Sequence, residues 1–84
     1  MNKDAVIIIF NIIKRNFTVD LEVPLDISAN DLVHALNTAY ELGIDTSDIK
    51  KCYLKAENPI ALLKGNKTLA EFGLHNGSVI NFTE

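Results

Sequence analysis

The stretch TLAEFGLHNGSVINFTE, residues 68–84, decides the fold. Its first seven residues are too few for a full helix, and we expect a single helical or 3₁₀ turn there. Thr68 is the predicted cap of that turn, and Leu69 and Phe72 are expected to enter the core. An Asn-Gly pair then turns the chain into residues 78–82, whose alternating pattern predicts a strand. A sheet must therefore be completed by strands that come earlier in the chain.

Two predicted strands open the sequence. Residues 5–13, AVIIIFNII, are rich in β-branched side chains and apolar on both faces, which indicates a strand in the middle of a sheet. Residues 17–23 alternate strictly between apolar and polar, as half-buried strands do. The polar break at 14–16 is short, so the two strands form a predicted hairpin.

A helix is predicted after Pro24. Ser28 followed by Asp31 is a variant of the capping box that begins helices. Gly43 is placed to end the helix in a left-handed conformation. The expected apolar stripe between them consists of Leu32, Ala35, Leu36, Ala39 and Tyr40.

The remaining pattern predicts two more strands. Residues 51–56 alternate, with Cys52 and Leu54 expected to point inward, and residues 60–63 form a short strand. The predicted order is β-β-α-β-β-(short turn)-β, in a single domain that spans residues 1–84. One helix on one face of a mixed sheet is an α+β fold.

Composition narrows the function. The net charge of −3 and pI of about 5.2 disfavour nucleic acid as a partner. No apolar run is long enough to insert in a membrane or to serve as a signal sequence, so we expect a cytoplasmic protein. The chain has one cysteine, Cys52, and two histidines, His34 and His75, which are far apart in sequence. We expect a buried, unreactive thiol rather than a nucleophile, and we expect no metal site and no cofactor.

The order of elements resembles the β-grasp fold. Residues 18–32, TVDLEVPLDISANDL, are similar to the second strand and helix start of ubiquitin, and residues 65–82 are similar to its final turn and strand. A closer resemblance is to the small bacterial ubiquitin-like proteins of the YukD/EsaB family. It is carried by the length, by the first strand, by the Asp-Leu-x-Val-Pro segment before the helix, and by Leu69, Glu71, Gly73, Leu74, Asn76, Gly77 and Ile80.

This resemblance implies a non-enzymatic accessory or regulatory protein of a type VII (WXG100, ESX-like) secretion system. Its implied partners are proteins, such as the cytoplasmic domains of membrane components of that system. The sequence has no C-terminal Gly-Gly, because it reads Thr83-Glu84, so we expect no conjugation. Two alternatives stay open: a relative of ubiquitin-like modifiers and sulfur carriers, and a structural homodimer unrelated to secretion.

We expect a partner-binding site on the sheet face without the helix. Alternation places Ile7 and Ile9 on that open face, and neighbouring strands are expected to add the others. An exposed apolar patch often marks a partner site, although β propensity alone also explains these residues. Asn81 and Thr83 stand in place of a His and a Val of ubiquitin, so the ubiquitin-type patch is not reproduced. The expected site consists of Ile7, Ile9, Lys51, Tyr53, Val79 and Asn81.

Overall fold

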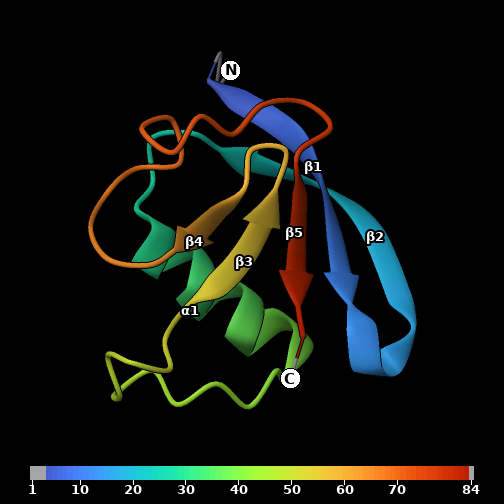
Figure 1. Ribbon diagram of the computed structural model, residues 1–84, viewed down its shortest axis with the longest axis vertical. Coiled ribbons are helices and arrows are strands. Elements are labelled where there is room, and N and C mark those ends of the chain that lie inside the picture. Colours follow the sequence, from blue (N-terminus) through green and yellow to red (C-terminus); the bar gives the residue numbers. More distant parts are fainter. Residues whose placement is uncertain (1–3, 84) are drawn as a thin grey trace.

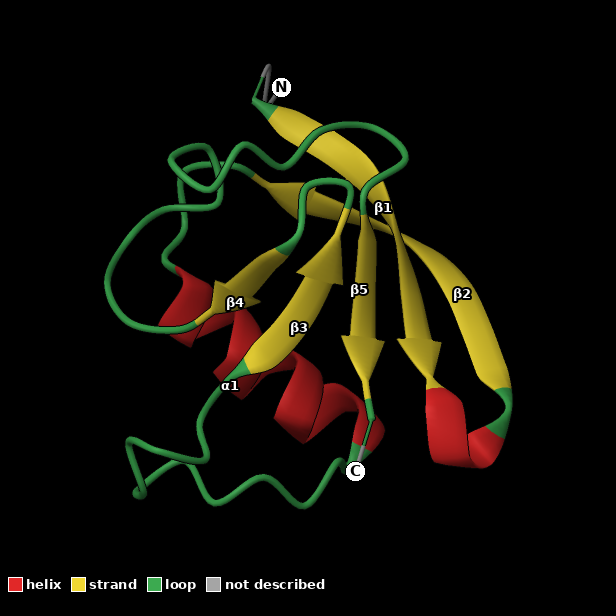
Figure 2. Ribbon diagram, viewed as in Figure 1, coloured by secondary structure: helices red, strands yellow, loops and turns green. Residues whose placement is uncertain are grey.

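The computed structural model describes residues 4–83, which form a mixed five-stranded sheet with one helix across one face (Figure 1). Figure 2 shows the helix behind the sheet and the other face open. This is the predicted α+β architecture in the predicted order, whereas residues 1–3 and Glu84 lie outside the described residues. The elements are β1 (Ala5–Ile12), η1 (Ile13–Arg15), β2 (Phe17–Pro24), α1 (Ala29–Tyr40), β3 (Leu54–Glu57), β4 (Ala61–Leu63) and β5 (Val79–Phe82).

The sheet has the strand order β2-β1-β5-β3-β4, so the first and last strands are neighbours at its centre. They run parallel, with Ile9 opposite Val79. The residues just before β5 also bind to β1. Asn76 Oδ1 accepts a hydrogen bond from the Ile7 N–H at 2.8 Å, and the Gly77 N–H donates to the Ile7 carbonyl at 2.9 Å. The predicted Asn-Gly turn therefore extends the hydrogen bonding between β1 and β5 to residues that precede β5.

The core lies between the sheet and α1. Ile8 and Phe10 of β1 and Ile80 of β5 are fully buried, as the alternation predicts. The predicted helical stripe is partly wrong, because Ala35 and Ala39 are exposed. Burial follows the i, i+3, i+4, i+7 spacing from a start three residues earlier, so that Leu32, Val33 and Leu36 face the core. The buried helix residues are Ala29, Leu32, Val33 and Leu36.

Helix α1 begins at the predicted cap. Ser28 Oγ accepts a hydrogen bond from the Asp31 N–H at 3.0 Å. The N–H groups of Ala29 and Asn30, which have no partner within the helix, donate to carbonyls of the β4–β5 connection at 2.8 and 2.9 Å. The helix start and that connection therefore hold each other in place.

The end of α1 differs from the prediction. The helix ends at Tyr40, and the residue that closes it is Glu41, which has a left-handed φ of 52° and whose N–H donates to the Asn37 carbonyl. Gly43 also has a positive φ, of 77°, but it lies in the loop after the cap. The Arg15 guanidinium, which reaches across from η1, donates to the carbonyls of Tyr40 and Glu41 at 2.6 Å each. Charge-assisted hydrogen bonds to terminal carbonyls stabilise this helix end without a glycine at the position.

The turn at 68–74 has the predicted cap in reciprocal form. Thr68 Oγ1 accepts from the Glu71 N–H at 3.2 Å, and Glu71 Oε1 accepts from the Thr68 N–H at 3.0 Å. This capping box places Leu69 in the core with no exposed surface, and Leu74 is also buried.

The strand predicted at 51–56 begins later, at Leu54. The Asp48 carbonyl accepts from the N–H groups of Lys51 and Cys52 at 2.9 and 3.0 Å. The Tyr53 N–H donates to the Lys51 carbonyl at 3.1 Å. These local hydrogen bonds take the N–H groups that a strand would offer to its neighbour. Lys51 therefore lies in a turn and not on the sheet.

We predict that Leu69→Ala lowers the free energy of unfolding by about 3 kcal/mol, because it leaves a cavity in a site that is fully buried. The control is Ile49→Ala, since Ile49 is 83% exposed. Its cost should stay within about 0.5 kcal/mol. Urea denaturation of both variants measures the difference, and equal losses would contradict the placement of Leu69.

We predict that the capping box makes stability depend on pH. Two hydrogen bonds from Thr68 hold the pKa of the Glu71 carboxyl below its ordinary value of 4.5. The larger effect comes from the Thr68 N–H and the smaller from its hydroxyl. The stabilisation is therefore present above that value and is lost as pH falls through the lower pKa of the folded state. Urea denaturation should show the stability difference between wild type and Glu71→Gln shrinking from neutral pH to about pH 3. A difference that does not vary with pH would contradict this role.

Candidate functional site

The open face of the sheet presents the side chains that alternate with the core residues. From β1 these are Ile7, Ile9 and Asn11, and from β5 Val79 and Asn81. The flanking strands β2, β3 and β4 place their outward residues in register with them: Thr18, Asp20, Glu22, Lys55, Glu57 and Leu62.

An apolar strip, defined here as Ile7, Ile9 and Val79, lies in the middle of this face. Ile7 is 51% exposed, and Ile9 and Val79 are half-buried and paired with each other across the parallel β1–β5 register. The structure therefore brings together three of the predicted site residues.

Carboxylates border the apolar strip on both sides. Glu22 and Asp20 of β2 stand opposite Ile7 and Ile9, and Glu57 of β3 stands opposite Val79. All three carboxylates are exposed. A partner that covers the strip meets apolar surface at the centre and negative charge at the rim.

A chain of polar side chains crosses the sheet beside the strip. Thr18 Oγ1 donates to Asn11 Oδ1, and Asn11 Nδ2 donates to Asn81 Oδ1, both at 2.8 Å. Asn81 Nδ2 then donates to a carboxylate oxygen of Glu57. The side-chain amide of Asn81, another predicted site residue, is therefore hydrogen-bonded to both Asn11 and Glu57. The apolar strip ends at Asn81.

Lys51 and Tyr53 lie beyond Asn81 and do not join the apolar strip. Continuing the β3–β5 register by two residues brings Tyr53 level with Thr83, away from Val79. The predicted site is therefore two adjacent surfaces rather than one. Lys51 is exposed and Tyr53 is half-buried.

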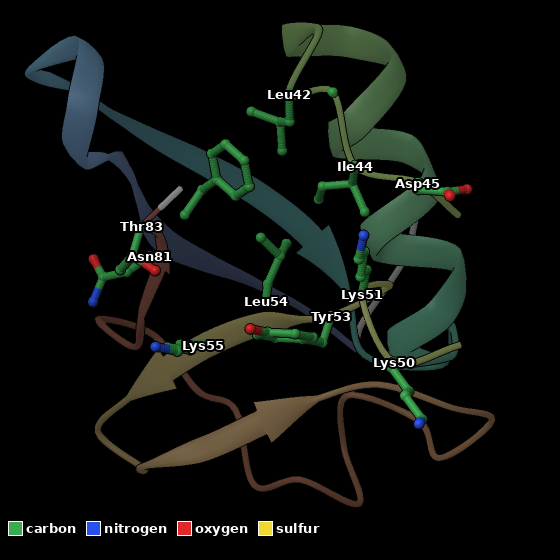
Figure 3. Close-up of a pocket in the computed structure, with 12 residues that line it drawn as sticks. Leu42, Ile44, Asp45, Lys50, Lys51, Tyr53, Leu54, Lys55, Asn81 and Thr83 are labelled. Atoms are coloured by element: carbon green, nitrogen blue, oxygen red, sulfur yellow. The ribbon is translucent and has the colours of Figure 1, made fainter. Parts of the chain in front are cut away.

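These two residues line a second surface, the basic hollow, of about 480 Å³. Figure 3 shows Leu42 and Ile44 on one side, Tyr53 and Lys55 on the other, and Asn81 and Thr83 at one end. The full lining is Leu42, Gly43, Ile44, Asp45, Lys50, Lys51, Tyr53, Leu54, Lys55, Asn81, Phe82 and Thr83.

Sequence reasoning missed two exposed apolar residues at the β4 edge. Ile60 is 91% exposed and Leu62 is 42% exposed, and both line a shallow groove of about 490 Å³ beside Lys55 and Asn81. The alternation of residues 60–63 contained the signal, because Leu63 is buried and Leu62 must then face outward.

The candidate reactive groups are placed as follows. Cys52 is buried, its Sγ–H donates to Asn30 Oδ1 at 3.2 Å, and burial raises the pKa of the thiol. The nucleophilic thiolate is therefore disfavoured. His34 is exposed on α1, and His75 is exposed in the loop before β5. Within residues 4–83, no three His, Cys, Asp or Glu side chains gather closely enough to hold a metal ion.

In the part of the chain that the structure describes, no helix has the length and apolar character needed to span a bilayer.

Comparison with solved structures places this fold among ubiquitin-like domains. The C-terminal ubiquitin-like domain of mouse tubulin-specific chaperone e superimposes with a TM-score of 0.70, at 10% identity, over 93% of this chain and 84% of that one. A de novo design based on ubiquitin superimposes with a TM-score of 0.63, at 16% identity, over 94% and 87% of the two chains. Identities this low establish the β-grasp fold alone.

Comparison with curated protein sequences found no match. The family model of protein YukD of the WXG100 protein secretion system matches residues 7–81, which include every strand residue from Ile7 of β1 to Asn81 of β5 and the whole of α1. The match covers most of the sequence, and it agrees with the ubiquitin-like fold. This chain belongs to the YukD family of ubiquitin-like proteins of the WXG100 secretion system.

Proposed function

We propose that this chain is a non-enzymatic accessory component of the WXG100 secretion system that binds a protein partner through its open sheet face. The partner is a cytoplasmic domain of a membrane component of that system, and the contact takes place in the cytoplasm. The family membership supports the secretion role. The apolar strip supports the mode of action, and it is the single observation that carries this proposal.

The strip has the features of a binding surface. Ile7 exposes half of its surface at the centre of a sheet whose other face already supplies the core. Covering exposed apolar side chains releases their hydration water and favours association. The bordering carboxylates Asp20, Glu22 and Glu57 restrict the choice of partner, because a like-charged rim would be repelled.

The placement of Cys52 supports a role without covalent catalysis. Its thiol is covered by the core and its pKa is raised, which opposes formation of a nucleophilic thiolate at neutral pH. Binding through a preformed surface requires no such group.

We predict that Ile7→Glu or Ile9→Glu lowers capture of the cytoplasmic domain at least about tenfold, because each substitution puts a charge into the apolar strip. The assay is a pull-down with purified cytoplasmic domains of the membrane components of the same secretion system. Ile13→Glu is the matched control, since Ile13 is 53% exposed but lies in η1 outside the open face. Circular dichroism verifies that each variant is folded.

Capture that is unchanged in Ile7→Glu and Ile9→Glu, or reduced equally in Ile13→Glu, contradicts this proposal. Sedimentation of the chain alone at several concentrations gives a second check. A stable dimer that Ile7→Glu dissolves would assign the strip to self-association instead.

A further inference from the structure

The basic hollow lies at the end of the sheet, where β3 begins and β5 ends, and it is a second feature that points to a ligand. It gathers three of the chain's eight lysine and arginine residues, Lys50, Lys51 and Lys55, although the net charge of the chain is −3. Among the lining residues Asp45 is the one carboxylate, so the lining carries a charge of about +2. This is opposite in sign to the rim of the apolar strip.

The Asp45 carboxylate accepts hydrogen bonds within its own turn. Its Oδ1 accepts from the Ser47 hydroxyl at 2.6 Å and from the Ser47 N–H at 3.1 Å. These hydrogen bonds, with a smaller contribution from Lys51, hold the pKa of the Asp45 carboxyl below its ordinary value. The carboxylate therefore stabilises the loop that carries Lys50 and Lys51 and does not neutralise all three lysines.

The C-terminal end of α1 lies close to the hollow through Leu42, and helix ends of this kind repel anions. Here the last carbonyls are occupied, because Arg15 donates to those of Tyr40 and Glu41. The positive charge of the Arg15 guanidinium therefore offsets the negative potential at the C-terminal end of α1.

The shape of the hollow suits a peptide. Its volume of about 480 Å³ lies in the range of ligand clefts, and the half-buried Tyr53 and Ile44 line it from opposite sides. In Figure 3 the Lys51 side chain extends from the turn toward Ile44, while Lys50 extends outward. Lysine side chains are flexible point charges, so they can pair with carboxylates spaced along a peptide. The lining contains no arginine, whose guanidinium would bind a phosphate through two parallel hydrogen bonds.

We infer that the basic hollow binds a short acidic peptide segment of the protein partner. A long polyanion such as nucleic acid would extend past the hollow to the carboxylates Asp20, Glu22 and Glu57 of the open sheet face. A short acidic segment next to an apolar one would complement both the basic hollow and the apolar strip. This inference deepens the proposed function, on which it rests for the identity of the partner.

The test is a titration of the isotope-labelled chain with a short amidated peptide that alternates glutamate and leucine, followed by NMR. We expect shifts confined to the amides of residues 42–45, 50–55 and 81–83 and weaker binding as salt is raised. The double variant Lys51→Glu/Lys55→Glu should bind the peptide about tenfold more weakly. Its dispersed spectrum verifies that it is folded.

The matched control is Lys14→Glu/Lys64→Glu, which changes the net charge equally at two exposed lysines outside the hollow. Its affinity should stay within about twofold of wild type. Equal loss in both double variants, equal binding of a peptide that alternates lysine and leucine, or binding of inorganic phosphate at the same affinity overturns the inference. Because no secretion component is present in this titration, its outcome is independent of the pull-down.

Discussion

The parallel pairing of β1 with β5 is the constraint on which the rest of the structure depends. It joins segments from opposite ends of the described chain, and a contact of such long sequence separation needs specific support. That support is polar: Ser78 is fully buried, its hydroxyl donates to the Asn58 carbonyl at 2.8 Å, and its carbonyl accepts from the Ile9 N–H at 2.8 Å. The same pairing fills the core on one face and aligns Ile9 with Val79 on the other.

The open face follows from this arrangement. Central strands need β-branched residues for extended backbone and close packing, so β1 carries isoleucine on both faces. The hydrogen-bonded chain from Thr18 to Glu57 then interrupts the apolar surface at Asn81, beyond which the hollow begins. A single sheet thus offers an apolar surface with an acidic rim beside a hollow with basic charge.

Much of the fold could be predicted from the sequence, because period-two alternation and capping are local. The faces of β1, the Ser28 cap and the Asn-Gly turn all follow from neighbouring residues. Where prediction failed, a competing contact decided. Asp48 draws Lys51 out of the expected strand, and Arg15, distant in sequence, allows α1 to end at Glu41. For the candidate site, alternation correctly placed Ile7 and Ile9 on the open face, whereas the separation of Tyr53 from the apolar strip depended on the register between β3 and β5, which no local pattern encodes.

The central claim is that the strip aligned by the β1–β5 pairing is the partner surface. The most direct measurement labels the isoleucine δ1 methyl groups and follows their NMR signals as the cytoplasmic domain of the secretion component is added. If the strip is the partner surface, the signals of Ile7 and Ile9 shift or broaden. The signals of Ile13 and Ile49, which are equally or more exposed but lie off the sheet face, stay unchanged. Perturbation of Ile13 or Ile49 with no change at Ile7 and Ile9 would contradict it.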